Sequence, residues 1–187
     1  MGEDGGSQRW VEAGLAALAR GGIDAVRVEV VAQDLGVTKG GFYRRFKDRR
    51  ALLDAMLAQW SAGRVDAIER HTDLAGQAAD ARLREVIRLY AERRNAVGMA
   101  IELAIRQWAR SDAAAASEVA KVDAARLTNV AALYTSLGFT PAEAQARAVL
   151  FYAFIFGQGL LFPEASPAGH ADLMASCEDV LTAGPGR

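Results

Sequence analysis

The stretch that decides the fold runs from Val28 to Leu53 and reads VEVVAQDLGVTKGGFYRRFKDRRALL. Val31 and Leu35 recur at helical spacing, and Gly36 follows where a turn needs a positive φ, which glycine adopts without steric cost. Thr38 then stands where an N-cap residue would begin a second helix, with its hydroxyl as the cap. The stretch therefore predicts two short helices joined by a tight turn.

The second helix, expected from Thr38 to Phe46, has two different sides. Phe42 and Phe46 lie four residues apart, so they share the side that packs against the first helix. The opposite side is left with residues that are cationic, small or phenolic: Lys39, Gly40, Tyr43, Arg44 and Lys47.

Positive charge is concentrated in this second helix and just after it. Residues 38–50 contain six cations and one anion, which gives a net charge of +5, whereas the whole chain carries −1. The cations are Lys39, Arg44, Arg45, Lys47, Arg49 and Arg50. A run of cations alone would indicate only a solvated surface. Because a helix-turn-helix pattern precedes it, the cluster favours a polyanionic partner, and duplex DNA is the leading candidate.

The stretch resembles the N-terminal DNA-binding domain of the TetR family of transcriptional regulators. The family's turn and recognition helix are matched by Val31, Ala32, Gly36, Val37, Thr38, Tyr43 and Phe46. The polar cap, basic residue and Leu-rich helix that follow are matched by Asp48, Arg49, Leu52 and Leu53. Two positions depart from the pattern: Val28 replaces a frequent Thr or Ser cap, and Gly41 replaces a small hydroxyl residue or Ala.

The adjacent glycines Gly40 and Gly41 weaken the predicted recognition helix. Each interior Gly costs about 1 kcal/mol of helix propensity relative to Ala. Two interpretations are open: the glycines let DNA approach the backbone closely, or the helix is loose until DNA orders it.

The whole chain is predicted to be all-α, in two domains. We expect residues 1–6 to be a disordered leader, and a first helix to begin at Ser7 and end at Gly21 and Gly22. By resemblance, this helix buttresses the helix-turn-helix, giving a three-helix DNA-binding domain over residues 1–47. Residues 48–187 would form a helical ligand-binding and dimerisation domain, beginning with a helix capped by Asp48 that extends to about Arg70.

The clearest helix start is Thr140-Pro141-Ala142-Glu143, a capping box with proline at the first helical position. The helix that follows is apolar nearly all round from Ala148 to Phe162, so it must be buried on more than one side. We infer a subunit interface. The resemblance implies the same, a homodimer through the last two long helices, which map to 141–161 and 167–181.

The resemblance also implies a ligand cavity among the helices of the second domain. Candidate lining residues are the aromatic, sulfur and amide side chains Tyr90, Met99, Trp108, Tyr134, Phe151, Phe154 and Gln158. From the residues alone, core packing is the simpler interpretation of any one of them. Few interior charges are evident, and Glu102 with Arg106 is interpreted as a surface i, i+4 pair, so we expect a small, largely apolar ligand.

Enzyme and membrane functions are not indicated. His71 and His170 are far apart, no cluster has metal-ligand spacing, and no nucleophile-elbow, phosphate-loop or dinucleotide pattern is present. We therefore expect no catalytic residue, no metal and no cofactor. No run approaches the roughly 20 apolar residues of a membrane span, and the first ten residues are polar, so we expect a cytoplasmic protein.

The function implied by the resemblance is a homodimeric repressor that a small molecule releases from a palindromic operator in double-stranded DNA. The candidate DNA contacts are Arg9, Thr38, Lys39, Gly40, Gly41, Tyr43, Arg44, Arg45, Lys47 and Arg49. Among these, Arg49 resembles the family's phosphate-contacting lysine. Two alternatives stay open: an activator or ligand-independent regulator of the same fold, and a small-molecule-binding or scaffold protein that has lost DNA binding.

Overall fold

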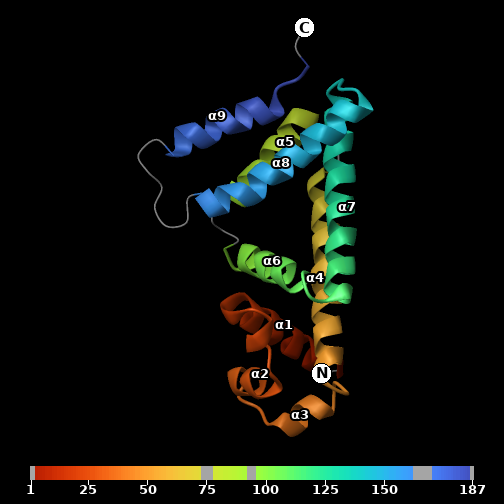
Figure 1. The fold of residues 1–187 in the computed structure, drawn as a ribbon, viewed down its shortest axis with the longest axis vertical. Coiled ribbons are helices and arrows are strands. Elements are labelled where there is room, and N and C mark those ends of the chain that lie inside the picture. The colour runs from red at the N-terminus through yellow and green to blue at the C-terminus, as the bar shows by residue number, and fades with distance from the viewer. Residues whose placement is uncertain (1–2, 73–77, 92–95, 162–169, 186–187) are drawn as a thin grey trace. The chain divides into compact units, whose positions relative to one another are not determined.

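The computed structural model describes residues 3–72, 78–91, 96–161 and 170–185, and within these ranges the chain is helical without any strand (Figure 1). The all-α prediction is confirmed. In chain order the elements are α1 (Glu3–Gly21), the 3-10 helix η1 (Ile23–Ala25), α2 (Val28–Asp34), α3 (Lys39–Tyr43), α4 (Arg49–Thr72), α5 (Ala79–Ala91), α6 (Ala96–Trp108), α7 (Ala113–Ser136), α8 (Pro141–Leu161) and α9 (His170–Thr182).

The helices form two compact units, which we describe separately. Unit 1 comprises Met1–Arg64 and Ala96–Val122, and unit 2 comprises Val65–Asn95 and Asp123–Arg187. The long helices α4 and α7 contribute residues to both units. These units group helices by packing, and the functional division at residue 47 stays a prediction.

In unit 1, α1 is the central helix. Both α2 and α6 pack against it, and α6 also contacts η1. α1 also approaches α4 closely, because a Cβ atom built on Gly14 would lie 2.7 Å from the sulfur of Met56. The first helix begins earlier than predicted: Ser7 lies inside α1 and Glu3–Gly6 are helical, so the expected cap and disordered leader are wrong for these residues. The predicted stop is confirmed, since α1 ends at Gly21 and Gly22 has a φ of 68°.

The turn between α2 and α3 has the conformation that the sequence predicts. Gly36 has a φ of 66°, and the amide of Val37 donates to the carbonyl of Ala32 at 2.9 Å, which closes the turn. Val37 itself is 43% exposed. Val37 therefore does not fill the inside of the turn.

Unit 2 is built on one apolar cluster contributed by α5, α7 and α8, with α9 packed on α5. Its best-defined boundary is the start of α8, where the predicted capping box is confirmed. The Thr140 amide donates to Glu143 Oε2 at 3.0 Å, and the Glu143 amide donates to Thr140 Oγ1 at 3.4 Å. The Thr140 hydroxyl, which donates to Glu143 Oε2 at 2.7 Å, and the Thr140 amide together lower the pKa of Glu143.

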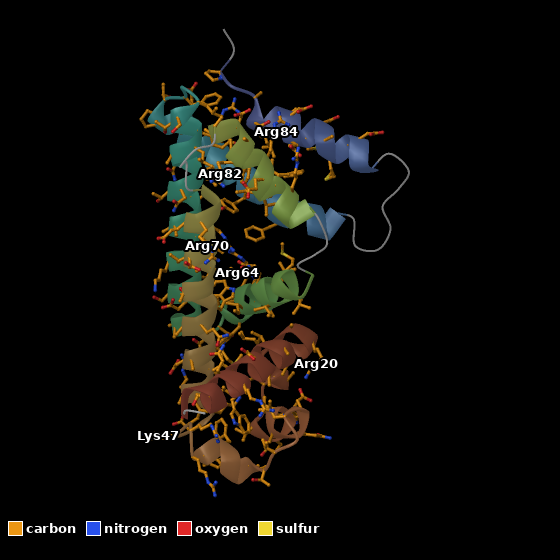
Figure 2. All side chains as sticks on the ribbon, turned by 180° about the vertical axis from the view of Figure 1, so that it is seen from behind. Arg20, Lys47, Arg64, Arg70, Arg82 and Arg84 are labelled. Atoms are coloured by element: carbon orange, nitrogen blue, oxygen red, sulfur yellow. The ribbon has the colours of Figure 1, made fainter. Side chains whose placement is uncertain are left out.

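One predicted surface pair is buried instead. Glu102 on α6 is only 2% exposed, and its carboxylate lies between Arg106 Nε at 2.9 Å and Arg64 Nε at 3.5 Å. Arg64 reaches it from α4 (Figure 2). The sequence showed the i, i+4 neighbour but not the cation from a distant helix, so the surface interpretation was wrong. With Arg126 also buried at 1% exposure, the interior holds charges that were not expected.

No helix among the described residues is both long enough and apolar enough to cross a membrane.

Candidate nucleic-acid interface

The recognition helix α3 is held in place by Phe42. Its ring is fully buried, packs edge-on against Trp10 of α1 at 5.3 Å between centroids, and stacks on Phe46 at 5.5 Å. The predicted pairing of Phe42 and Phe46 on the inner side is confirmed. Five residues are too few for a stable isolated helix, so the position of α3 depends on this aromatic contact.

α3 is shorter than the predicted helix from Thr38 to Phe46. α-Helical assignment ends at Tyr43, but the amides of Arg45 and Phe46 both donate to the Phe42 carbonyl, at 2.8 and 3.0 Å. The helical turn therefore continues in tightened form, which explains how Phe46 reaches the inner side. Thr38 occupies the N-cap position with an extended backbone, but its hydroxyl makes no capping hydrogen bond, contrary to expectation.

The outer side of α3 is exposed and cationic. Lys39, Gly40, Tyr43 and Arg44 are all exposed, and Tyr43 is 63% accessible. Lys47 follows on the short link between α3 and α4, and its side chain is exposed as well (Figure 2). Neither Arg44 nor Lys47 forms an ion pair with any residue that the structure describes. These two side chains present unneutralised charge to solvent.

Lys39 has an acidic neighbour that the sequence did not reveal. Its Nζ lies 2.5 Å from Oε1 of Glu29 on α2, and this contact lowers the pKa of Glu29. Both side chains are more than half exposed, so the pair contributes little to stability. Lys39 must exchange this carboxylate for a phosphate or a base if it contacts DNA.

Arg45 turns away from the outer side. Its Nη1 donates to the Gly41 carbonyl at 3.1 Å, and its guanidinium lies so close to Gly6 of α1 that a Cβ atom there would overlap it. Arg9 and Trp10 join these residues in lining a small recess of about 80 Å³. The predicted contacts Arg9, Gly41 and Arg45 are thus brought together at one edge of α3.

The two arginines in the first turn of α4 bind other groups of the protein and not only solvent. Asp48 caps the helix as predicted, accepting from the Ala51 amide at 2.9 Å. Arg49 donates from Nε to the Val26 carbonyl at 2.6 Å and from Nη2 to the Ile23 carbonyl at 2.7 Å. Arg50 is bound to two carboxylates, Asp54 at 2.8 Å and Asp112 at 2.5 Å.

Comparison with known proteins agrees with this geometry. Residues 11–56 match the family model for bacterial regulatory proteins of the tetR family. A TetR-family transcriptional regulator from Rhodococcus sp. has a similar structure with a TM-score of 0.74 and 25% identity, over 95% of this chain and 99% of that one. Residues 11–56 are therefore a tetR-family segment, and the chain has the fold of a TetR-family regulator.

Other solved structures share the fold at lower identity. A transcriptional regulator from Saccharomonospora viridis in complex with choline has a TM-score of 0.79 and 16% identity, over 95% of each chain. Salmonella enterica GusR has a TM-score of 0.72 and 15% identity, over 97% of this chain and 94% of that one. A search of curated protein sequences finds no match.

The residues predicted to line a ligand cavity fall in both units. In unit 1, Met99 is half-buried and Trp108 is buried. In unit 2, Tyr134 and Phe151 are fully buried in the same apolar cluster, and burial raises the pKa of Tyr134 to about 12. The side chains of Tyr90 and Gln158 lie outside the described residues. A shared ligand site stays a prediction.

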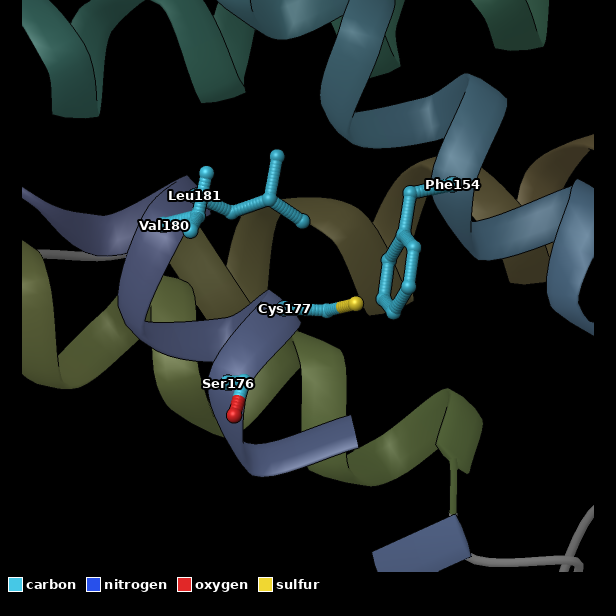
Figure 3. Close-up of a pocket in the computed structure, with 5 residues that line it drawn as sticks. All are labelled: Phe154, Ser176, Cys177, Val180 and Leu181. Carbon is cyan, nitrogen blue, oxygen red and sulfur yellow. The ribbon is translucent and has the colours of Figure 1, made fainter. Parts of the chain in front are cut away.

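The predicted dimer helices, α8 and α9, expose apolar side chains. On α8, Val149 and Leu150 are 51% and 62% exposed, and on α9 Leu173 and Val180 are also exposed. Between the two helices is an open recess of about 310 Å³ with an apolar lining, across which Phe154 and Cys177 point toward one another (Figure 3). Lone exposed apolar residues are ordinary, so whether this set forms an interaction surface stays a prediction.

Among the residues that the structure describes, no group of three or more His, Cys, Asp and Glu side chains is placed to hold a metal ion.

Proposed function

We propose that this protein is a homodimeric transcriptional repressor that binds a palindromic operator in duplex DNA and is released by a small molecule. Two copies of α3 would enter successive major grooves about 34 Å apart, which one protomer alone cannot do. Ligand binding would change the spacing of the two reading helices through α4. The switch requires that the ligand bind the two conformations with different free energies.

The observation that carries the proposal is the outer side of α3. The Phe42 anchor directs Lys39, Tyr43 and Arg44 outward together, and Arg44 and Lys47 have no acidic partner among the described residues. Basic side chains that no carboxylate neutralises release counterions when they meet phosphates, which drives binding to DNA. We assign Arg44 to a base edge or phosphate, and Tyr43 and Lys47 to phosphates.

Dimerisation is supported by the solvent-facing side of α8. Ala146, Val149, Leu150 and Ala153 are all exposed at helical spacing, and none is polar. Small and aliphatic residues in this pattern let a second helix approach closely and bury apolar surface. The apolar recess with α9 extends this surface.

A small-molecule effector is supported by the helical second domain and by the structural neighbour in complex with choline. The sequence favoured a largely apolar ligand because few interior charges were evident. Glu102 and Arg126 are buried, but both already have partners within the protein, so we propose a small, largely apolar ligand.

The test begins with selection of binding sites from random duplex DNA, followed by affinity measurements as a function of salt. We expect a palindromic site, and a binding constant that falls steeply as salt rises. Lys47→Gln should reduce the salt slope by about 0.9 for each protomer. Lys121→Gln on α7 makes the same change in net charge, has its own partner in Glu118, and should leave the slope unchanged.

Three results would redirect the proposal. Selection that yields no site, together with no binding at low salt, would favour a small-molecule-binding or scaffold protein. Binding that no compound in a ligand screen relieves would favour a ligand-independent regulator. Specific binding that raises transcription from an adjacent promoter would favour an activator.

A further inference from the structure

Arg49 makes contacts that differ from the phosphate contact suggested by its place in the sequence. We propose that Arg49 is a positioning residue, which clamps the link between α1 and α2 to the start of α4 and so fixes the orientation of the reading helix. The inference rests on the proposed DNA binding for its effect on affinity. The clamp itself is a property of the free protein.

The clamp joins segments that are 23 and 26 residues apart in the chain. Arg49 Nε and Nη2 donate to the carbonyls of Val26 and Ile23 at 2.6 and 2.7 Å. Val26 is fully buried, and the Ile23 carbonyl also closes η1 by accepting from the Val26 amide at 3.2 Å. One guanidinium therefore holds both ends of the short segment that leads directly into α2.

The side of the guanidinium used here is the one that would bind a phosphate in bidentate fashion. Nε and one Nη form the fork that matches a carboxylate or phosphate, and both are occupied by carbonyls. A bidentate phosphate contact through this Nε side would therefore cost both intramolecular hydrogen bonds. Lys47, two residues earlier, makes no such contact with a described residue and is the free cation at this edge.

The clamped segment also has a second neighbour. α6 contacts both η1 and α1, so the 3-10 helix that contains Ile23 lies against α6 as well. Arg49 thus fixes the relation among α4, η1 and the helix-turn-helix within unit 1. A helix as short as α3 is not stable by itself, so its orientation depends on the elements packed around it. A shift of η1 relative to α4 would therefore move the outer side of α3 away from its position for DNA binding.

The test uses Arg49→Lys, Arg49→Gln and the control Lys47→Gln, on the duplex that wild-type protein selects. Lysine keeps the charge but cannot donate in two fixed directions, so Arg49→Lys should weaken DNA binding about tenfold, with an unchanged salt slope. Arg49→Gln should weaken it at least as much, also with an unchanged slope. Lys47→Gln should lower the slope by about 0.9 for each protomer.

Hydrogen exchange in the DNA-free protein gives a second readout. Both Arg49 variants should speed exchange in residues 22–28 about tenfold, and Lys47→Gln should leave it at the wild-type rate. Far-ultraviolet circular dichroism at 25 °C confirms that each variant is folded before affinities are compared.

Two outcomes would overturn the inference. In the first, the Arg49→Lys protein binds DNA as tightly as wild type, and Arg49→Gln lowers the slope of affinity against salt. Arg49 would then be a phosphate contact. Faster exchange without any loss of affinity would make it a structural residue with no positioning role. If the wild-type protein binds no DNA, the proposed function fails, and unchanged exchange in the Arg49 variants would separately refute the clamp.

Discussion

Replacing each of the two adjacent glycines of α3 by alanine separates the stability of the reading helix from its fit to DNA. The chain itself requires glycine at neither position, because both have ordinary helical φ values. A Cβ atom on Gly41 would meet nothing within 4 Å, and one on Gly40 would meet only Thr38 Oγ1, at an ordinary 3.7 Å. Alanine should therefore be accommodated at both positions without strain.

The expected gain follows from helix propensity. Each glycine costs about 0.8–1 kcal/mol relative to alanine in a helix interior, so Gly40→Ala and Gly41→Ala should each stabilise the free protein by up to that amount. If order in α3 limits DNA binding, Gly41→Ala should tighten binding up to about fivefold, because 1 kcal/mol corresponds to about that factor. Gly41 is half-buried toward Arg9 and Trp10, so its new methyl group should not touch DNA.

Gly40 lies on the outer side, between the exposed Lys39 and Tyr43. A methyl group there should hold the DNA backbone away, so Gly40→Ala should weaken binding about tenfold although the free protein is more stable. The assays are thermal unfolding of the free protein and titration of the selected duplex. Equal affinities for the two variants would refute close approach at Gly40, and absence of stabilisation in both would refute the propensity argument.

Three further changes test other parts of the structure. Leu150→Glu should dissociate the dimer in light-scattering measurements, whereas Val97→Glu, at an equally exposed position on α6, should not; a dimeric Leu150→Glu protein would place the interface elsewhere. Thr140→Ala removes the capping box and should lower the melting temperature by about 2–4 °C. An unchanged melting temperature would mean that the cap does not contribute to stability. Arg50 and the Ala115 amide lower the pKa of Asp112, so its contribution to the free energy of unfolding is fully present above the unfolded-state pKa near 4 and is lost as the pH falls through the lower folded-state pKa. The difference in melting temperature between wild type and Asp112→Asn should therefore be largest near pH 7, shrink as the pH falls below about 4, and vanish only below the folded-state pKa; a constant difference would exclude the ion pair as its source.

The features that sequence predicted well are those that depend on neighbouring residues. Gly22 and Gly36 both have positive φ where the pattern ended a helix, and Thr140 and Glu143 cap each other as their spacing implied. Each of these depends on hydrogen bonds or backbone angles within a few positions of the chain. The inner side of α3 was equally predictable, since residues four apart share a helix face.

The features that sequence could not predict depend on residues far apart in the chain. Six neighbouring cations looked equivalent, yet Arg49 bonds to carbonyls more than twenty residues earlier, and Arg50 pairs with Asp112, sixty-two residues later. Glu102 looked like a surface residue because only its local partner was visible. No periodic pattern records which carboxylate or carbonyl a long, flexible side chain will reach.

The contact between Trp10 and Phe42 makes the protein's own fluorescence a probe of the reading helix. The three tryptophans are Trp10, Trp60 and Trp108, and all are buried in unit 1. Among the described residues, Trp10 is the tryptophan whose ring packs against a ring of α3, so a variant with phenylalanine at positions 60 and 108 would carry a single fluorescent side chain beside α3. Its emission maximum and quenching by iodide would then show, without any label, whether α3 is ordered before DNA arrives or only afterwards.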